Sequence, residues 1–382
     1  MRDDMEQTRI RCAIMRGGTS KAVFIMKKDL PADPTIKNKV VRAVFGSPDI
    51  RQINGLGGAD PLTSKLAVIG PPSKEGCDCD YIFAQVDINS EKIIWDEICG
   101  NIVSAVGPFA IDEGWVDAAE PVTRVKINCP NLNTPRTLIA EIPVANGIAR
   151  VEGDYQIDGV PGTGAKIGID WADMAGGTTG YVLPTGNTKD ILEIPELGKV
   201  EVSIIDCPNL MVYCRAKDFG LKGTEGPGEI DSDQKLLKDL LNAQKAAGKL
   251  INTEADGIVA IGDPEDFEEY TTGKKISKEE MDFSARQIFM GKLHKTLGGS
   301  VTASCGVAVR IPGTIVNEIA GTKVAQRSEI RIGHPAGIIT CESEIQIQEA
   351  GIKVTRAVIF RTARRIMDGY VYVPTKVLEP IA

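Results

Sequence analysis

CGNIVSAVGPFAIDEG, residues 99–114, is a run of small and apolar side chains between glycines, and VTASCGVAVRIPG, residues 301–313, repeats its character. Each run is long enough for a buried helix of about three turns. Around both runs lie short segments that are rich in β-branched residues and bounded by turn residues, which is typical of strands. We therefore predict two similar halves, in each of which β-strands wrap around one apolar helix.

Helices outside these two runs are predicted from the signals at their ends. Asp33 and Pro34 are typical of a helix start, and the helix that they begin is expected to end at Gly46. The segment 231–247 is predicted to be a surface helix. The segment 277–294 opens with a serine–glutamate capping box, so a helix is expected there as well.

Proline and glycine interrupt the pattern within residues 181–190, and we expect the two halves to meet there. The predicted N-terminal domain covers residues 1–184, and the predicted C-terminal domain covers residues 185–382. We expect the functional site in the cleft between them, because ligand sites often form at domain interfaces.

The composition predicts a soluble globular protein, with 42% hydrophobic and 25% charged residues. A formal net charge of −8 argues against binding to nucleic acid or to an anionic membrane, whereas a small anionic ligand needs only a few local cations. No apolar run is long enough to span a membrane. The N-terminus has no signal-peptide pattern, so we expect a cytoplasmic protein whose nine cysteines are reduced.

The segment MRGGTSK, residues 15–21, lies between two predicted strands. It forms either a simple hairpin turn or an anion-binding loop. In the second case Gly17 and Gly18 let backbone N–H groups approach a carboxylate, and Ser20 donates a hydrogen bond. The glycine spacing is not that of a nucleotide-binding P-loop.

The segment INGLGGADPLTSKLAVIG, residues 53–70, places Lys65 where an apolar strand begins. A lysine in this place is commonly solvated. In a closed site, however, desolvation favours the neutral amine, which is a usable base. The preceding Gly57 and Gly58 could present N–H groups to a ligand.

Cys99 stands directly before Gly100 and the start of the first apolar helix. It is a buried filler, a metal ligand or a thiol held for chemistry. At a helix start, free N–H groups and the helix dipole stabilise a thiolate. The polar approach WDEICGN argues against burial among apolar side chains and so favours chemistry.

Other catalytic and metal-binding patterns are missing from the sequence. CDC at residues 77–79 is too short for a zinc knuckle, and His294 and His334 do not form a metal-binding motif. There is no G-x-S-x-G nucleophile turn, and the glycine-rich segment 159–168 does not match a dinucleotide fingerprint. We therefore expect neither a metal nor a cofactor.

Seven blocks taken together resemble one known family. They are MRGGTSK, GLGGADPLTSKLAVI, CGNIVSAVGPFAIDEG, DGVPGTGA, LPTGN, RIPGTIV and RIGHPAG. Because they are spread in order along the sequence, the resemblance covers nearly the whole chain. The family is that of PrpF and methylitaconate isomerase, whose members share the fold of diaminopimelate epimerase. The resemblance implies an α+β fold of two pseudo-symmetric, β-rich domains, each wrapped around a central helix.

The resemblance also implies cofactor-independent proton transfer on a small unsaturated di- or tricarboxylate. Family activities include isomerisation of 3-methylitaconate, cis–trans isomerisation of 2-methylaconitate and tautomerisation of 4-oxalomesaconate. Some members accompany a methylcitrate-processing dehydratase, so a non-catalytic accessory protein is a further alternative. The expected partner is a small anionic carboxylate, and a homo-oligomer is left open.

By the same resemblance, Lys65, Cys99 and Ser20 line the active site. We hypothesise that Lys65 and Cys99 are acid–base groups, either of which could remove the first proton, because a double-bond shift takes one proton and returns another two carbons away. Ser20 and backbone N–H groups would stabilise the negative charge of the intermediate. The predicted substrate-binding residues are Gly17, Gly18, Thr19, Gly57, Gly58, Ser64, Gly100, Asn101, Gly162 and Thr163.

The second half departs from the wider superfamily, because diaminopimelate epimerase uses two thiols, one from each half. Here alignment leaves Val301 near the second position, and Cys305 falls further along the helix, where a core role is expected. The second base must then be another group, which favours Lys65. Candidate cations for substrate carboxylates are Arg16, Lys21, Lys295 and Arg331.

Overall fold

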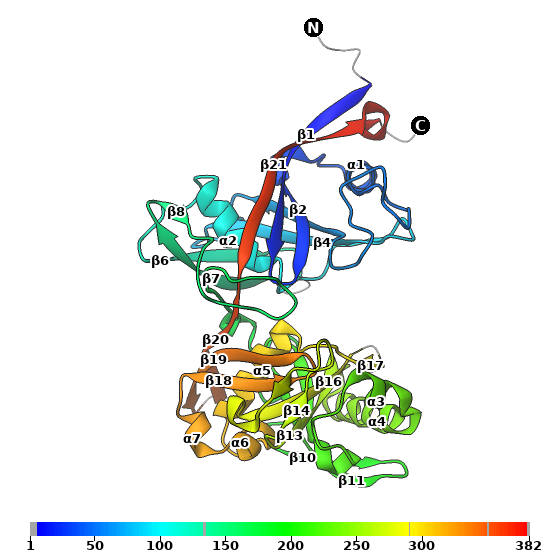
Figure 1. Ribbon diagram of the computed structural model, residues 1–382, viewed down its shortest axis with the longest axis vertical. Helices are drawn as coiled ribbons and strands as arrows, with labels where there is room; N and C mark the ends of the chain where they lie inside the picture. Colours follow the sequence, from blue (N-terminus) through cyan, green and yellow to red (C-terminus); the bar gives the residue numbers. More distant parts are fainter. Residues whose placement is uncertain (1–5, 133–134, 290, 350, 380–382) are drawn as a thin grey trace. The chain divides into compact units, whose positions relative to one another are not determined.

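The computed structural model describes residues 6–132, 135–289, 291–349 and 351–379 (Figure 1). The chain forms two compact units. Unit 1 contains residues 1–169 and 361–382, and unit 2 contains residues 170–360.

Unit 1 is a mixed sheet with a helix against each of its faces. Its strands are β1 (Gln7–Gly17), β2 (Ser20–Met26), β3 (Lys65–Gly70), β4 (Cys79–Val86), β5 (Ile93–Ile94), β6 (Val122–Cys129), β7 (Arg136–Ala145), β8 (Ile148–Ala149) and β21 (Ala363–Pro374); β9 (Ile167–Asp170) spans the boundary of the two units. The strand order is β21–β1–β2–β3–β4–β6–β7–β8, and β5 also pairs with β4. The neighbours β2–β3 and β4–β6 are parallel.

Helix α1 (Pro34–Phe45) covers one face of this sheet. As predicted, Asp33 caps it, because its carboxylate accepts two backbone N–H hydrogen bonds of 2.9 Å each. Gly46 ends the helix in the left-handed conformation, with φ of 71°. Apolar side chains of α1 share one core with strand residues such as Val23 and Leu66.

Helix α2 (Val103–Asp112) covers the opposite face. The Phe109 ring lies 5.3 Å from that of Phe24 on β2, between centroids. Because side chains alternate along a strand, Phe24 points away from Val23 and its α1-side core. Gly107 lets α2 approach β7 closely, since a Cβ there would lie 2.7 Å from a side-chain carbon of that strand.

Unit 2 contains a second set of strands and helices. Its strands are β10 (Asp190–Ile194), β11 (Gly198–Asp206), β12 (Leu210–Arg215), β13 (Gly257–Gly262), β14 (Phe267–Glu268), β15 (Lys275–Ile276), β16 (Phe283–Phe289), β17 (Lys292–Leu293), β18 (Glu329–His334), β19 (Gly337–Gln348) and β20 (Gly351–Arg361), which ends at the first residue of the segment that returns to unit 1. Its helices are α3 (Pro227–Ser232), α4 (Gln234–Ile251), α5 (Gly299–Arg310), α6 (Ile315–Ala320) and α7 (Thr322–Ala325).

The strand pairing of unit 2 repeats that of unit 1. The β11–β12 hairpin leads through α4 to β13, which is parallel to β12, just as β1–β2 leads through α1 to β3. β16 is antiparallel to β13 and parallel to β18, as β4 is to β3 and β6. The buried α5 takes the place of α2. The prediction of two similar β-rich halves, each with a central helix, is confirmed.

The C-terminal segment 361–382 belongs to unit 1, whereas the expected division into residues 1–184 and 185–382 places it in the second half. β21 runs antiparallel to β1 along the whole length of that strand (Figure 1). This long ladder satisfies backbone hydrogen bonds at the edge of the β1–β2 hairpin, which determines where the segment packs. No local pattern in the sequence predicts that this segment packs in unit 1.

The predicted helix over residues 277–294 is wrong. The capping box of Ser277 and Glu280 does form, with a 2.9 Å hydrogen bond from the Ser277 N–H, but it caps only a single 3-10 turn. The chain then continues as β16, which pairs with both β13 and β18. A central strand buried on both faces lacks polar–apolar alternation, so its sequence resembles that of a buried helix. Residue 290 lies outside the described residues.

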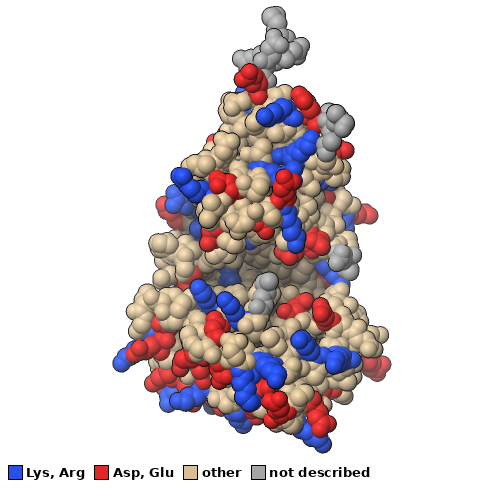
Figure 2. Space-filling model, turned by 90° about the vertical axis from the view of Figure 1, so that its right-hand side faces the viewer, with Lys and Arg blue, Asp and Glu red and all other residues tan. Residues whose placement is uncertain are grey.

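The surface carries charges of both signs. Figure 2 shows Lys and Arg interspersed with Asp and Glu on the face that it displays. All nine cysteines are free thiols. In the described ranges of the chain, no helix is long and apolar enough to cross a membrane.

Candidate active site

Ser20 and Lys65 lie on the α2-facing side of the unit 1 sheet. Lys65 on β3 is in register with Ala22 on β2 and pairs directly with Gln85 on β4. Ser20 and Ala22 point to the same face, because side chains alternate with a period of two. Phe24 continues that row and packs on α2. The sheet register therefore places a hydroxyl, an amine and an amide on one face.

Lys65 is buried, with 8% of its surface exposed. Its Nζ donates a 2.6 Å hydrogen bond to Oε1 of Gln85 and lies 5.1 Å from the centroid of the Phe83 ring. Among the residues that the structure describes, it forms no ion pair. Lys65 is thus removed from solvent beside a neutral amide and an aromatic ring, rather than solvated at a strand end.

The loop before Lys65 is held by internal hydrogen bonds. Ser64 Oγ donates to the Val86 carbonyl and accepts from the Gln52 amide, both at 2.8 Å. The Gly57 N–H donates to a backbone carbonyl of α1, and a Cβ at Gly57 would lie 2.2 Å from Gln52. A Cβ at Gly58 would likewise lie 2.2 Å from a neighbouring threonine of the loop. These residues fix the path of the chain into β3.

The turn between β1 and β2 rests on the residues that follow Cys99. A Cβ at Gly17 or Gly18 would lie 2.5 Å or 2.1 Å from oxygen atoms of Asn101, so only glycine fits there. The Thr19 N–H donates to Oδ1 of Asn101 at 3.4 Å. The structure therefore brings the predicted anion-binding turn and the start of α2 together.

Two further contacts hold this turn. The Gly18 N–H donates to the Thr362 carbonyl at 2.9 Å. Arg16 donates to the carbonyls of Gly18 and Thr362, also at 2.9 Å each. Arg16 thus stabilises the turn, and the Gly18 N–H is already engaged. Ser20 differs, because its buried Oγ has no hydrogen-bond partner in the described part of the chain.

Cys99 is half-buried and lies one turn before α2, where its carbonyl accepts a 3.0 Å hydrogen bond from the Val103 N–H. Tyr81, on the α2-facing side of β4, lies beside it. Burial raises the pKa of Tyr81 well above its ordinary value, and Cys99 and Cys129 contribute in the same direction. Cys99 therefore sits over the same sheet face as Ser20 and Lys65.

Arg361 is a candidate site residue that sequence reasoning missed. It is 8% exposed, and its Nε donates to Oδ1 of Asn101 at 3.2 Å. Burial lowers the pKa of Arg361, and the neighbouring Tyr155 and Cys99 oppose that effect. Its only sequence signal is an arginine directly after the apolar run AVIF, 260 positions beyond Asn101.

The loop DGVPGTGA, residues 158–165, reaches the same turn. A Cβ at Gly159 would lie 3.4 Å from the methyl group of Thr19, and one at Gly164 would lie 3.2 Å from Thr362. Gly162 and Thr163 are exposed at the tip of this loop. The structure thus brings three of the sequence blocks and Arg361 together in unit 1.

The remaining candidates have structural roles or lie in unit 2. Arg331 pairs with Asp282 at 2.9 Å, and Lys295 is exposed. Nδ1 of the buried His334 accepts a hydrogen bond from a nearby backbone N–H. Cys305 is fully buried, and burial raises its pKa to about 12, which agrees with the expected core role. The described residues hold no group of three or more potential ligands arranged for a metal ion.

Unit 2 has no thiol at the position that corresponds to Cys99. Gly107 of α2 lies close to β7, and Gly306 of α5 lies close to β19, which is the equivalent strand of unit 2. Counting back from these two glycines matches Cys99 with Gly298, and not with a residue near Val301 as expected from the alignment of sequence alone. The expected absence of a second cysteine at this position is nevertheless found.

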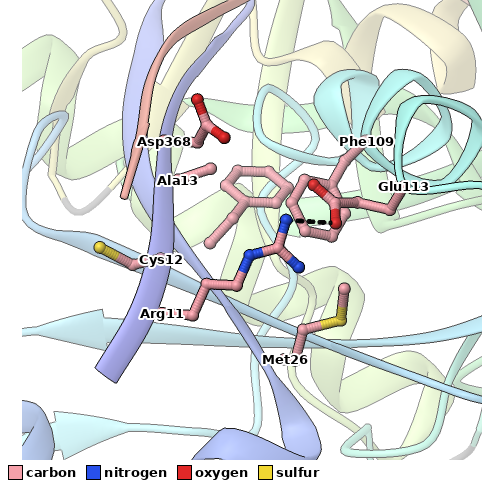
Figure 3. A pocket seen from close by; sticks show the side chains of 8 residues that line it. Arg11, Cys12, Ala13, Met26, Phe109, Glu113 and Asp368 are labelled. Atoms are coloured by element: carbon pink, nitrogen blue, oxygen red, sulfur yellow. Dashed lines mark ion pairs between the residues drawn. The ribbon is translucent and has the colours of Figure 1, made fainter. Parts of the chain in front are cut away.

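A small cavity elsewhere in unit 1 is not a ligand site. It has a volume of about 10 Å³ and lies between β1, β2 and α2, next to the 2.9 Å ion pair of Arg11 and Glu113 (Figure 3). That volume is about enough for a single water molecule. None of the predicted site residues lines it.

Two known isomerases are similar to this chain over nearly its whole length. The chain is 47% identical to the 3-methylitaconate isomerase of Eubacterium barkeri, over 96% of this chain and 98% of that protein. It is 34% identical to the 2-methyl-aconitate isomerase of Shewanella oneidensis, with coverage of 96% and 98%.

Solved structures show the same fold. A crystal structure of methylitaconate-delta-isomerase superposes with a TM-score of 0.91 at 46% identity, covering 99% of both chains. A hydroxyproline epimerase matches with a TM-score of 0.53 at 8% identity, over 97% of this chain and 93% of that one, which shows the fold alone. The predicted diaminopimelate epimerase-like fold is confirmed. The family model described as PrpF protein matches residues 7–374, and the chain therefore belongs to the PrpF family.

Proposed function

We propose that this protein is an isomerase that moves a proton and a double bond within a small unsaturated di- or tricarboxylate, of the 3-methylitaconate or 2-methylaconitate type. The observation that carries the proposal is the buried amine of Lys65 on the sheet face that also bears Ser20 and lies under Cys99. The similarity to two isomerases of such acids supports the substrate class.

The proposed reaction needs one base and one acid. A base removes the allylic proton next to a carboxylate, and the electron pair of the C–H bond becomes part of a dienolate. The double bond then shifts, and an acid returns a proton two carbons away, so that no oxidant or reductant is consumed. A neutral Lys65 amine can accept the first proton and a Cys99 thiol can supply the second, or the two can act in the opposite order.

Stabilisation of the dienolate is assigned to Ser20 and Arg361. The Ser20 hydroxyl is buried and free to donate to a carboxylate oxygen of the substrate. Arg361 supplies positive charge next to Cys99, and Asn101 fixes its Nε. A carboxylate that accepts from a guanidinium and a hydroxyl develops its extra charge where donors are already in place.

The predicted substrate-binding residues divide into two groups. Gly18, Gly57 and Ser64 use the groups expected to bind substrate in internal hydrogen bonds, so we assign them to shaping the site. Gly17 and Gly58 share that role, because each leaves no room for a side chain. Direct contacts are assigned to the remaining predicted positions: Thr19, Gly100, Asn101, Gly162 and Thr163.

Proton NMR in deuterated buffer tests this function. The purified protein is offered 3-methylitaconate, 2-methylaconitate, trans-aconitate and 4-oxalomesaconate separately. We expect isomerisation of one of the first two acids, with solvent deuterium in the product. Cys99→Ser and Lys65→Ala should lose activity, whereas Cys77→Ser and Lys74→Ala, which alter a half-buried thiol and an exposed lysine of the same unit, should retain it.

The outcomes separate the alternatives. Turnover of 4-oxalomesaconate alone would replace the allylic isomerase by a keto–enol tautomerase. If the folded protein converts none of the four acids, the proposed substrate class is contradicted and the accessory-protein alternative is favoured. Full activity of both Cys99→Ser and Lys65→Ala would contradict the acid–base assignment.

A further inference from the structure

Lys65 has a partner that neither the sequence blocks nor the relatives' names point to. Gln85 stands directly opposite it in the antiparallel β3–β4 ladder, so the two side chains extend from the same face of the sheet. The Nζ–Oε1 hydrogen bond of 2.6 Å is the polar contact that holds the amine. Gln85 therefore determines where the Lys65 nitrogen lies.

The amide of Gln85 can present only its oxygen to Lys65. Its Nε2 donates to the carbonyls of Pro61 and Ser64, at 3.1 Å and 3.0 Å. Both amide hydrogens are used by these two acceptors, and a flipped amide would point its oxygen at two carbonyl oxygens. The loop before β3 thus fixes the orientation of the amide, and the amide fixes the amine.

The partner of Lys65 is also uncharged. Other lysines of this protein pair with carboxylates: Lys189 with Glu318 at 2.7 Å, and Lys235 with Asp239 at 2.6 Å. Those hydrogen bonds raise the pKa of both lysines. A carboxylate in the place of Gln85 would stabilise the ammonium form of Lys65 in the same way. An amine that is to accept a proton must instead be in its neutral form.

The carboxylates in the segments next to Lys65 are engaged in their own turns. Lys21 is on the neighbouring strand β2, Asp60 is in the preceding loop and Asp87 follows β4. The Asp60 and Asp87 carboxylates accept backbone N–H groups of their own turns. Among the described residues neither carboxylate forms an ion pair with Lys65, so the amide is its polar partner and Phe83 its aromatic one.

The fold itself does not require a polar pair here. Leu66–Ala84 in unit 1 and Ile258–Ile288 in unit 2 are equivalent pairs, since each lies in the core beneath its first long helix. The residue before Leu66 and the residue after Ala84 are Lys65 and Gln85. Their counterparts in unit 2 are Gly257 and Phe289.

We propose that Gln85 is a positioning residue that holds the Lys65 amine in place for proton transfer without supplying a negative charge. The proposal rests on the proposed function for its kinetic consequence. It concerns the position and protonation of one side chain, however, and both can also be measured without a substrate.

The decisive variant is Gln85→Glu, which keeps the length of the side chain and adds a charge. The pH limb of kcat that reports the loss of a proton from the base should move to higher pH by about one unit or more, because an adjacent carboxylate favours the ammonium form. Activity at neutral pH should fall by about tenfold and recover at higher pH, with KM little changed. Gln348→Glu, an exposed site on β19, adds the same charge as a control.

A second variant separates positioning from packing. Gln85→Met keeps the volume but removes the acceptor, so kcat should fall over the whole pH range without displacement of the limb. A merely structural Gln85 would give losses that follow thermal stability in both variants. A limb that stays at its wild-type pH in folded, active Gln85→Glu would overturn the proposal.

A readout without substrate keeps this proposal distinct from the proposed function. In protein labelled with ¹³C at the lysine ε-carbons, the Lys65 signal is assigned by its loss in Lys65→Ala. Its titration midpoint should move to higher pH in Gln85→Glu and stay in place in Gln348→Glu. If it moves while none of the four acids is turned over, the proposed substrates fail but the role of Gln85 stands. An unmoved midpoint contradicts that role even in an active protein.

Discussion

Units 1 and 2 share one order of strands and helices but differ in what they place at equivalent positions. Both have a hairpin, a first helix against one sheet face and a buried glycine-containing helix against the other. The counterparts of Lys65, Gln85 and Cys99 are Gly257, Phe289 and Gly298. Unit 2 therefore forms the same order of strands and helices without a polar side chain at these places, so that order does not itself require the three polar groups of unit 1.

The asymmetry also distinguishes this chain from an enzyme that uses two equivalent thiols. A racemising site benefits from similar acid–base groups on opposite sides of one carbon. A double-bond shift takes a proton from one carbon and returns it at another, so unlike groups are sufficient. An amine and a thiol within a single unit suit the second task.

The largest expected effect comes from removing the thiol and offering one at the equivalent place in unit 2. Cys99→Ser should lower kcat by at least about 100-fold, because it removes an acid–base group. Adding Gly298→Cys to that variant should restore nothing. Proton NMR measures turnover and deuterium incorporation in the single and the double variant. Recovery of activity in the double variant would show that the two halves are functionally interchangeable.

The second effect concerns Arg361, the cation that the segment after unit 2 contributes to unit 1. Arg361→Gln should lower kcat/KM by roughly 10-fold or more, since a hydrogen bond to a charged group contributes about 1.5–3 kcal/mol and this one would act on the developing dienolate. Arg361→Lys should recover part of this loss. Steady-state kinetics separate KM from kcat. An unchanged kcat/KM in both variants would remove Arg361 from the substrate site.

The third effect compares α1 and α4, the equivalent first long helices of the two units. Asp33 caps α1 with two hydrogen bonds, whereas Asp233 caps α4 with one. Asp33→Ala should lower the free energy of unfolding by about 1–2 kcal/mol, and Asp233→Ala by about half of that. Urea denaturation followed by circular dichroism measures both, and Asp33→Asn is the control because asparagine also caps. Equal losses would indicate that packing, not capping, sets the stability of these helices.

The smallest effect tests whether unit 2 can be altered without affecting activity. Although burial opposes its ionisation, hydrogen bonds from Thr271 and Thr272 lower the pKa of Glu269 from 4.5 to about 2. The ionised group thus stabilises the folded state above pH 4.5, and this contribution is lost as the pH falls towards 2. Glu269→Gln should flatten the stability curve over that interval and leave turnover at neutral pH unchanged. A fall in turnover would assign unit 2 a direct role near this turn.

Much of the fold could be predicted from the sequence, because its signals are local. Asp33, Pro34 and Gly46 mark both ends of α1, and the two apolar runs correspond to α2 and α5. The helix expected over 277–294 was wrong because a doubly buried strand and a buried helix have similar sequences. The return of β21 to unit 1 depends on a ladder between the two ends of the chain, which no local pattern encodes.

The same distinction between local and long-range information applies to the candidate site. Lys65, Cys99 and Ser20 stand in recognisable blocks, and the structure places them on or over one sheet face. Gln85 gains its importance only from the β3–β4 register, and Arg361 only from a contact across 260 positions. Neither the strand register nor the long-range contact can be inferred from local patterns in a single sequence.

The pairing of β21 with β1 has a consequence for the order in which the chain is completed during synthesis. Unit 2 is whole once residue 360 has left the ribosome, while unit 1 still lacks a strand and Arg361. A nascent or truncated chain therefore already holds its amine, its thiol and its hydroxyl, but beside an unpaired β1 edge and without the guanidinium. The segment translated after unit 2 therefore completes unit 1, which acquires the β21 strand and the Arg361 guanidinium only once unit 2 has been made.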